Sequence, residues 1–85
     1  MSKYNTESFK IFIAEDDIRY SELLRYHLEL NPEYEVKTFS SGKKLIKAMH
    51  EKPDVITLDY SLPDTNGKEL LSFLKKESPD SQVVI

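Results

Sequence analysis

The stretch that decides the fold is Val55-Ile56-Thr57-Leu58-Asp59, with the loop Tyr60-Ser61-Leu62-Pro63-Asp64-Thr65-Asn66-Gly67 that follows it. Its apolar run is typical of a strand in a parallel sheet that is covered on both faces. The run ends in a carboxylate, and in open α/β sheets ligands bind just beyond the carboxyl ends of the strands. Asp59 therefore stands where chemistry is usually done, although an Asp at such a place can equally well begin a turn.

Length and composition fit one small domain. The chain has 85 residues, of which 39% are hydrophobic and 32% charged, with a formal net charge of −3. It has no cysteine, which excludes a disulfide framework and a thiolate zinc site. No apolar run approaches the roughly 20 residues that span a bilayer, and the negative charge argues against a nucleic-acid surface on this segment. We expect a flexible N-terminus over residues 1–8 and a cytoplasmic protein with no membrane contact.

Periodicity predicts strands and helices in alternation around the decisive stretch. Apolar or alternating runs at 10–14, 34–39, 54–59 and 82–85 predict four strands. Apolar residues at helical spacing predict three helices between them, with Asp17 placed to cap the first. The stripes that define these helices are Tyr20, Leu23, Leu24, His27 and Leu28; Leu45, Ile46 and Met49; and Leu70, Leu71 and Leu74. Of the first stripe, we expect Tyr20, Leu24 and Leu28 to lie in the core.

This order, strand-helix-strand-helix-strand-helix-strand with short connections, predicts an α/β fold with a parallel, three-layer sheet. The ends of the first and third strands then lie side by side, which brings Glu15 and Asp16 close to Asp59. Two unit charges about 4 Å apart repel by roughly 4 kcal/mol at an effective dielectric near 20. Because no Lys or Arg stands at these strand ends, Mg²⁺ with its oxygen ligands is the cation that fits. The alternative is that Glu15 and Asp17 form a solvated helix cap.

Two motifs carry a resemblance to a known family. The first is the strand Ile11-Phe12-Ile13-Ala14 with its acids Glu15-Asp16-Asp17, and the second is Asp59 with Pro63 four residues on and Gly67 eight residues on. Together they resemble the receiver domain of two-component response regulators. The resemblance implies a flavodoxin-like fold over residues 9–85, truncated before the end of the fourth strand-helix unit. In that loop Pro63 and Gly67 shape the backbone and let the third helix start.

The resemblance also implies a function for each acid. Asp59 would accept a phosphoryl group from a phosphohistidine on a sensor histidine kinase or a phosphotransfer protein, as in phosphorelays that regulate transcription. Asp16 would bind Mg²⁺ directly and Glu15 would support it. Asp59 and the backbone carbonyl of Ser61 would be further ligands. The metal would neutralise charge and hold the attacking carboxylate against the phosphoryl oxygens.

Parts of the family pattern lie beyond Ile85. These are the switch Ser or Thr that ends the fourth strand, and the Lys and switch aromatic of the fifth. We therefore expect that this segment alone does not transmit phosphorylation of Asp59 to an output surface. We also expect the edge of the fourth strand to be exposed, which favours dimerisation or exchange of elements between chains.

Two other functions are compatible with parts of the sequence. One is an interaction or dimerisation module that keeps the fold but is not phosphorylated. The other is an enzyme with Asp59 as nucleophile, as in the haloacid-dehalogenase-like phosphatases. Those enzymes place a second Asp two residues after the nucleophile, where this chain has Ser61, so we expect no enzyme.

Overall fold

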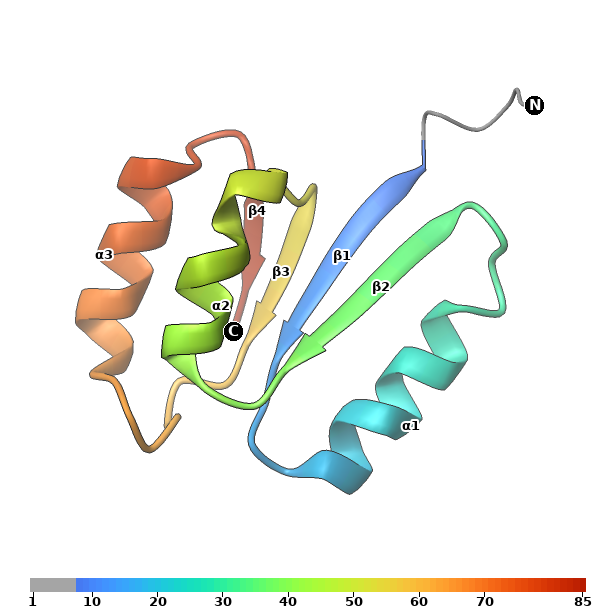
Figure 1. Ribbon diagram of the computed structural model, residues 1–85, viewed down its shortest axis with the longest axis horizontal. Helices are drawn as coiled ribbons and strands as arrows, with labels where there is room; N and C mark the ends of the chain where they lie inside the picture. Colours follow the sequence, from blue (N-terminus) through green and yellow to red (C-terminus); the bar gives the residue numbers. More distant parts are fainter. Residues whose placement is uncertain (1–7) are drawn as a thin grey trace.

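The computed structural model describes residues 8–85 and shows a four-stranded parallel sheet in the order β2-β1-β3-β4 (Figure 1). The strands are β1 (Phe9–Ala14), β2 (Tyr34–Phe39), β3 (Val55–Leu58) and β4 (Gln82–Val84). The helices are α1 (Ile18–Leu28), α2 (Gly42–Ala48) and α3 (Gly67–Glu77), and a short 3₁₀ turn, η1 (Met49–Glu51), follows α2. The predicted parallel α/β fold is confirmed. Most of the N-terminus for which flexibility was predicted, residues 1–7, lies outside the described residues.

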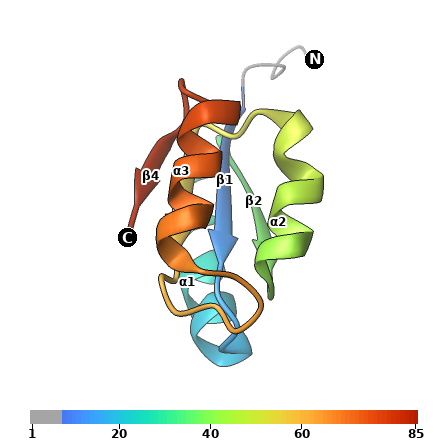
Figure 2. The ribbon, with the colours of Figure 1, turned by 90° about the vertical axis from the view of Figure 1, so that its left-hand side faces the viewer.

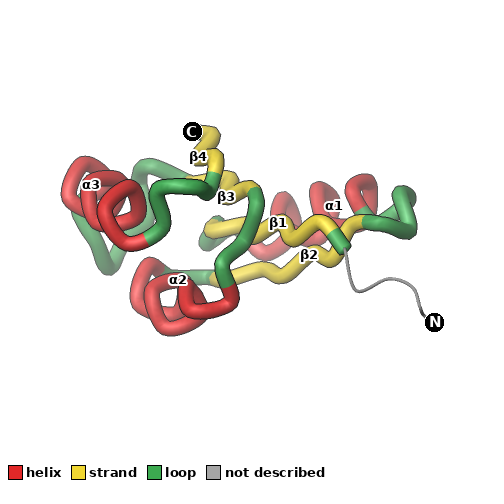
Figure 3. The backbone as a smooth tube through the Cα atoms, turned by 90° about the horizontal axis from the view of Figure 1, so that it is seen from above, coloured by secondary structure: helices red, strands yellow, loops and turns green. Residues whose placement is uncertain are grey.

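Strand β1 is buried on both faces, and each face has its own helical cover (Figure 3). Ile11 and Ile13 pack on the face that α1 covers, whereas Phe12 and Ala14 pack on the face that α2 and α3 cover. None of these four side chains is more than 4% exposed. This double burial explains why the strand reads as a continuous apolar run rather than an alternating one.

The larger core lies between the sheet and the helices α2 and α3. Its centre is formed by Leu45 of α2, Ile56 of β3 and Leu74 of α3, each fully buried. The remaining buried members are Phe12, Ala14, Ala48, Met49, Leu58, Leu62 and Leu70. On the opposite face the core is smaller, because α1 alone covers β1 and β2 there. In the described part of the chain, no helix is long and apolar enough to cross a membrane.

Each helix begins at a side chain that accepts hydrogen bonds from its first turn. Asp17 accepts from the backbone N–H of Tyr20 at 3.2 Å, as the sequence predicted, and Ser41 caps α2. Asn66 caps α3 by accepting from two backbone N–H groups, at 2.9 and 3.1 Å. Sequence reasoning missed this last cap, because it assigned the 60–67 stretch to a turn-rich loop without choosing its capping residue.

The expected core stripe of α1 is wrong in part. Tyr20 is 55% exposed and Leu23 56% exposed, whereas Leu24 and Leu28 are half-buried against the sheet. The reason is that α1 has only the two strands β1 and β2 beneath it, so a narrow line of side chains reaches the core. Ile46 of α2 is also partly exposed, at 37%.

The burial pattern makes a testable distinction between two isoleucines. Ile56→Val removes a methyl group at a fully buried position, whereas Ile18→Val removes the same group where the side chain is 68% exposed. We expect Ile56→Val to lower the free energy of unfolding by about 0.5–1.5 kcal/mol and Ile18→Val to change it by less than about 0.5 kcal/mol. Urea denaturation followed by circular dichroism measures both, and equal effects would contradict the described core.

Candidate metal centre

Backbone hydrogen bonds place two acids at the carboxyl end of the sheet. The N–H of Glu15 donates to the carbonyl of Phe39 in β2, and the N–H of Asp59 donates to the carbonyl of Ala14 in β1, each at 2.9 Å. The ladders therefore continue one residue beyond the strands on both sides of β1. Figure 2 shows this end of the sheet beside the loop that precedes α3.

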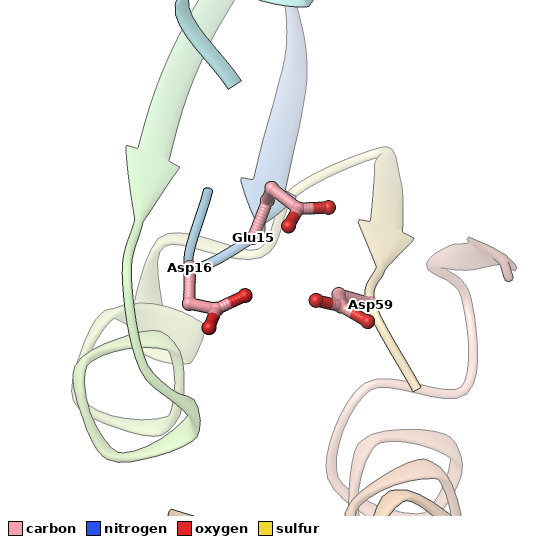
Figure 4. A group of neighbouring side chains, drawn as sticks. All are labelled: Glu15, Asp16 and Asp59. Carbon is pink, nitrogen blue, oxygen red and sulfur yellow. The ribbon is translucent and has the colours of Figure 1, made fainter. Parts of the chain in front are cut away.

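Three carboxylates meet at this end of the sheet. Figure 4 shows Glu15, Asp16 and Asp59 pointing toward one another, and one oxygen from each lies within 4.8 Å of the others. Glu15 and Asp59 are half-buried and Asp16 is exposed. The ion pairs of the described residues involve Arg25 and Lys37, neither of which pairs with this trio. A cluster of carboxylate oxygens without a basic partner fits a hard divalent cation such as Mg²⁺.

The neighbouring acid Asp17 has a different role. Its side chain caps α1, and its backbone N–H donates to Oε2 of Glu15 at 3.1 Å. The alternative of a solvated helix cap therefore describes Asp17, whereas Glu15 belongs to the trio. The helix cap and the acidic cluster therefore use different carboxylates, although Asp17 directly follows Asp16 in the sequence.

The acids differ in their affinity for protons. Burial, and then the charges of Asp59 and Asp16, raise the pKa of Glu15 above its usual value, against the lowering effect of the Asp17 N–H. The pKa of Asp59 is lowered, chiefly because the backbone N–H of Ser61 donates to its carboxylate. Glu15 therefore has a higher affinity for a proton than Asp59.

Ser61 makes two contacts with Asp59. Its backbone N–H and its hydroxyl donate to Oδ1 of Asp59 at 3.0 and 2.8 Å. The role predicted for its carbonyl, as a metal ligand, stays a prediction. Sequence reasoning did not find the hydroxyl contact, although an Asp followed two residues later by Ser is a known local hydrogen-bonding pattern.

The acids open onto a hollow between α1 and the edge of the sheet. Its walls come from α1, β1, β3 and β4 and from the loop after β3, and they include Glu15 and Asp59. The other side chains that line it include Tyr20, Leu24, Thr57, Tyr60, Val84 and Ile85.

Comparison with known proteins gives a consistent result. The family model of the response regulator receiver domain matches residues 11–85. The transcriptional regulatory protein CssR of Bacillus subtilis is 35% identical over 77 residues, which is 91% of this chain and 34% of CssR. A protein-glutamate methylesterase/protein-glutamine glutaminase of Clostridium acetobutylicum is 33% identical over 81 residues, 93% of this chain and 24% of that protein. The chain thus spans about a third or less of these relatives.

A solved structure of a response regulator has a similar fold. The response regulator TrrA of Thermotoga maritima, in complex with Mg²⁺-BeF, superposes with a TM-score of 0.78 and 25% sequence identity. The match covers 88% of this chain and 65% of that one. The flavodoxin-like arrangement is therefore shared, and a protein of the same fold holds Mg²⁺ together with a fluoride complex of beryllium.

The raised pKa of Glu15 predicts how stability depends on pH. In metal-free protein, the raised pKa means that Glu15 contributes most to the free energy of unfolding at a pH below its unfolded-state pKa. This contribution is lost as the pH rises through its folded-state pKa. Glu15→Gln should therefore stabilise the metal-free protein at pH 7, by a few tenths to about 1 kcal/mol. Urea denaturation in EDTA across the pH range measures the difference, which should shrink as the pH falls and Glu15 becomes neutral.

The matched control for this experiment is Glu33→Gln. Glu33 is exposed and lies just before β2, at the opposite end of the sheet. The difference in the free energy of unfolding between Glu33→Gln and the wild type should change little across the pH range. A Glu15→Gln protein less stable than wild type at pH 7 in EDTA would show that Glu15 is not under repulsion.

Proposed function

This chain belongs to the response regulator receiver domain family, and on that basis we propose that it is a phosphoacceptor in two-component signalling. Asp59 receives a phosphoryl group from a phosphohistidine on a sensor histidine kinase or a phosphotransfer protein. The observation that carries the proposal is the meeting of Glu15, Asp16 and Asp59 at the carboxyl end of the sheet, where Ser61 donates two hydrogen bonds to Asp59.

The proposed reaction is one phosphoryl transfer. A carboxylate oxygen of Asp59 attacks phosphorus and forms a P–O bond, while the P–N bond to the donor imidazole breaks and its electron pair stays on the imidazole nitrogen. Ser61 holds Oδ1 of Asp59 through two hydrogen bonds, so Oδ2 is the oxygen left to face the donor. An Asp carboxylate is ionised at neutral pH, and the lowered pKa of Asp59 favours that form further.

The metal site follows from the same residues. Asp16 and Asp59 would hold Mg²⁺, supported by Glu15 and by the backbone carbonyl of Ser61. When bound, the ion offsets the repulsion among the carboxylates and neutralises charge on the phosphoryl oxygens. The half-burial of Glu15 and Asp59 strengthens their interaction with such a cation compared with fully exposed acids.

The whole protein is proposed to be longer and regulatory. Its relatives include a transcriptional regulator and a methylesterase, each with a large part outside the matched segment. A receiver domain is itself regulatory, so the enzymatic activity named for the methylesterase is not assigned to this segment. We place the protein in the cytoplasm on the basis of its family. Self-association through the edge of β4 stays a prediction.

The proposal predicts that phosphorylation depends on Asp59. Incubation with acetyl phosphate and Mg²⁺ should raise the mass of the wild-type protein by one phosphoryl group, as measured by intact-protein mass spectrometry. Asp59→Asn should abolish the increase, because the amide is not a nucleophile of this kind. Asp54→Asn, at the other end of the same strand, should leave it unchanged.

Two results would count against phosphoacceptor function. One is a wild-type chain that binds Mg²⁺ but acquires no phosphoryl group under these conditions. The other is a phosphoryl group that persists in Asp59→Asn and maps to a different residue by peptide sequencing. Omission of Mg²⁺ is a further arm of the experiment, in which the wild-type reaction should slow strongly.

A further inference from the structure

The loop of residues 60–66, here called the site loop, runs from Asp59 to the start of α3 and contains Ser61. Both glycines of the chain lie against it. A Cβ atom on Gly42 would overlap the side chain of Thr65, and a Cβ atom on Gly67 would overlap the carbonyl oxygen of Tyr60. Neither glycine has a positive φ. The glycines therefore supply space for the site loop rather than an unusual backbone conformation.

A carboxylate ties the site loop to the beginning of α2. Oδ1 of Asp64 accepts from the backbone N–H of Gly42 at 2.8 Å, and Oδ2 accepts from the N–H of Lys43 at 3.0 Å. The N–H of Lys44 donates instead to the hydroxyl of Ser41, the residue that caps α2. Asp64 thus completes the cap of a helix that begins 22 residues earlier in the chain. These two amide donors also lower the pKa of Asp64, which favours its ionised form.

Three other residues of the site loop hold it to its surroundings. Ser61 donates hydrogen bonds to Asp59, Leu62 is buried in the core at 3% exposure, and Asn66 caps α3. Asp64, by contrast, is an exposed side chain whose two hydrogen bonds reach α2. Its replacement would therefore remove both of these hydrogen bonds between the loop and α2, while the core anchor and the α3 cap stay in place.

We propose that Asp64 is a positioning residue of the metal and phosphoryl site. Through its bonds to the first two amides of α2, it holds the site loop so that Ser61 presents its hydrogen bonds to Asp59 and its carbonyl to the metal. The inference rests on the proposed function, since it assigns Asp64 a role in that same site. Because coupling between two sites is reciprocal, metal binding should in turn strengthen the contact between Asp64 and α2.

The first test is the affinity for Mg²⁺, measured without any phosphoryl transfer. Titration of the full chain with Mg²⁺, followed by NMR through the backbone amide of Ser61, gives the dissociation constant. Asp64→Ala should weaken binding by about five- to tenfold. Asp64→Asn keeps one acceptor oxygen and should give an intermediate value. The matched control is Asp80→Ala, which removes another exposed Asp from the turn before β4.

The second test is hydrogen exchange of the Gly42 and Lys43 amides. In the wild type and in Asp80→Ala, saturation with Mg²⁺ should slow their exchange. In Asp64→Ala these amides should exchange faster, and Mg²⁺ should no longer change their rate. The NMR spectra show in the same samples whether each variant is folded, and Asp64→Asn provides the comparison if the alanine variant is not.

The outcomes separate this inference from the proposed function. A wild-type chain that binds no Mg²⁺ would overturn both together. A wild-type chain that binds Mg²⁺, with Asp64→Ala binding it equally well, would overturn the positioning role and leave phosphoacceptor function standing. Faster exchange at Gly42 with unchanged Mg²⁺ affinity would have the same meaning, because it would show that Asp64 is only a helix cap.

Discussion

The pairing of β1 with β3 is the constraint on which the site depends. Ala14 lies opposite Leu58 in this parallel ladder, so the residues that follow, Glu15 and Asp59, leave the sheet side by side. A shift of the register by one residue would turn the side chains of a strand to the opposite face. Because β1 is buried on both faces against different helices, its packing selects the register, and the register then brings the acids together.

This arrangement carries an electrostatic cost that the protein distributes unevenly. Two donors from Ser61 stabilise the charge on Asp59, whereas Glu15 bears the effects of burial and of its acidic neighbours. This difference is consistent with the proposed roles of Asp59 as a nucleophile and of Glu15 as a support for the cation. Similar carboxyl groups thus acquire different proton affinities from their surroundings, as in other sites where two acids have separate roles.

The sequence predicted the features that follow from a local pattern or from the end of a strand. It did not predict the features that depend on how the helices pack on the sheet. The meeting of Glu15 with Asp59 follows from the parallel order of the strands, and the cap at Asp17 from its place before a helix. The exposure of Tyr20 could not be read from helical periodicity, which gives a stripe but not the width of the surface beneath it. The bond from Asp64 to α2 joins residues far apart in the chain, and no local pattern marks it.

The two ends of the sheet differ in how well their polar groups are matched. At the amino end, Asp54 accepts from the backbone N–H of Lys10 at 2.8 Å, the Lys10 ammonium donates to the carbonyl of Glu51, and Glu51 pairs with Lys37. At the carboxyl end, three carboxylates converge. Within the described residues, the buried hydroxyl of Thr65 has no hydrogen-bond partner.

An unpaired buried hydroxyl costs about 1–3 kcal/mol, and the glycines that make room for the site loop cost conformational entropy. These unfavourable contributions gather around the site loop, next to the three carboxylates whose mutual repulsion a bound cation would offset. The hydrogen-bonded polar groups at the amino end of the sheet and the apolar core stabilise the fold against these unfavourable contributions. The polar groups that the fold leaves unmatched therefore lie at the end of the sheet where a cation from solution would bind, and such binding would stabilise the folded protein.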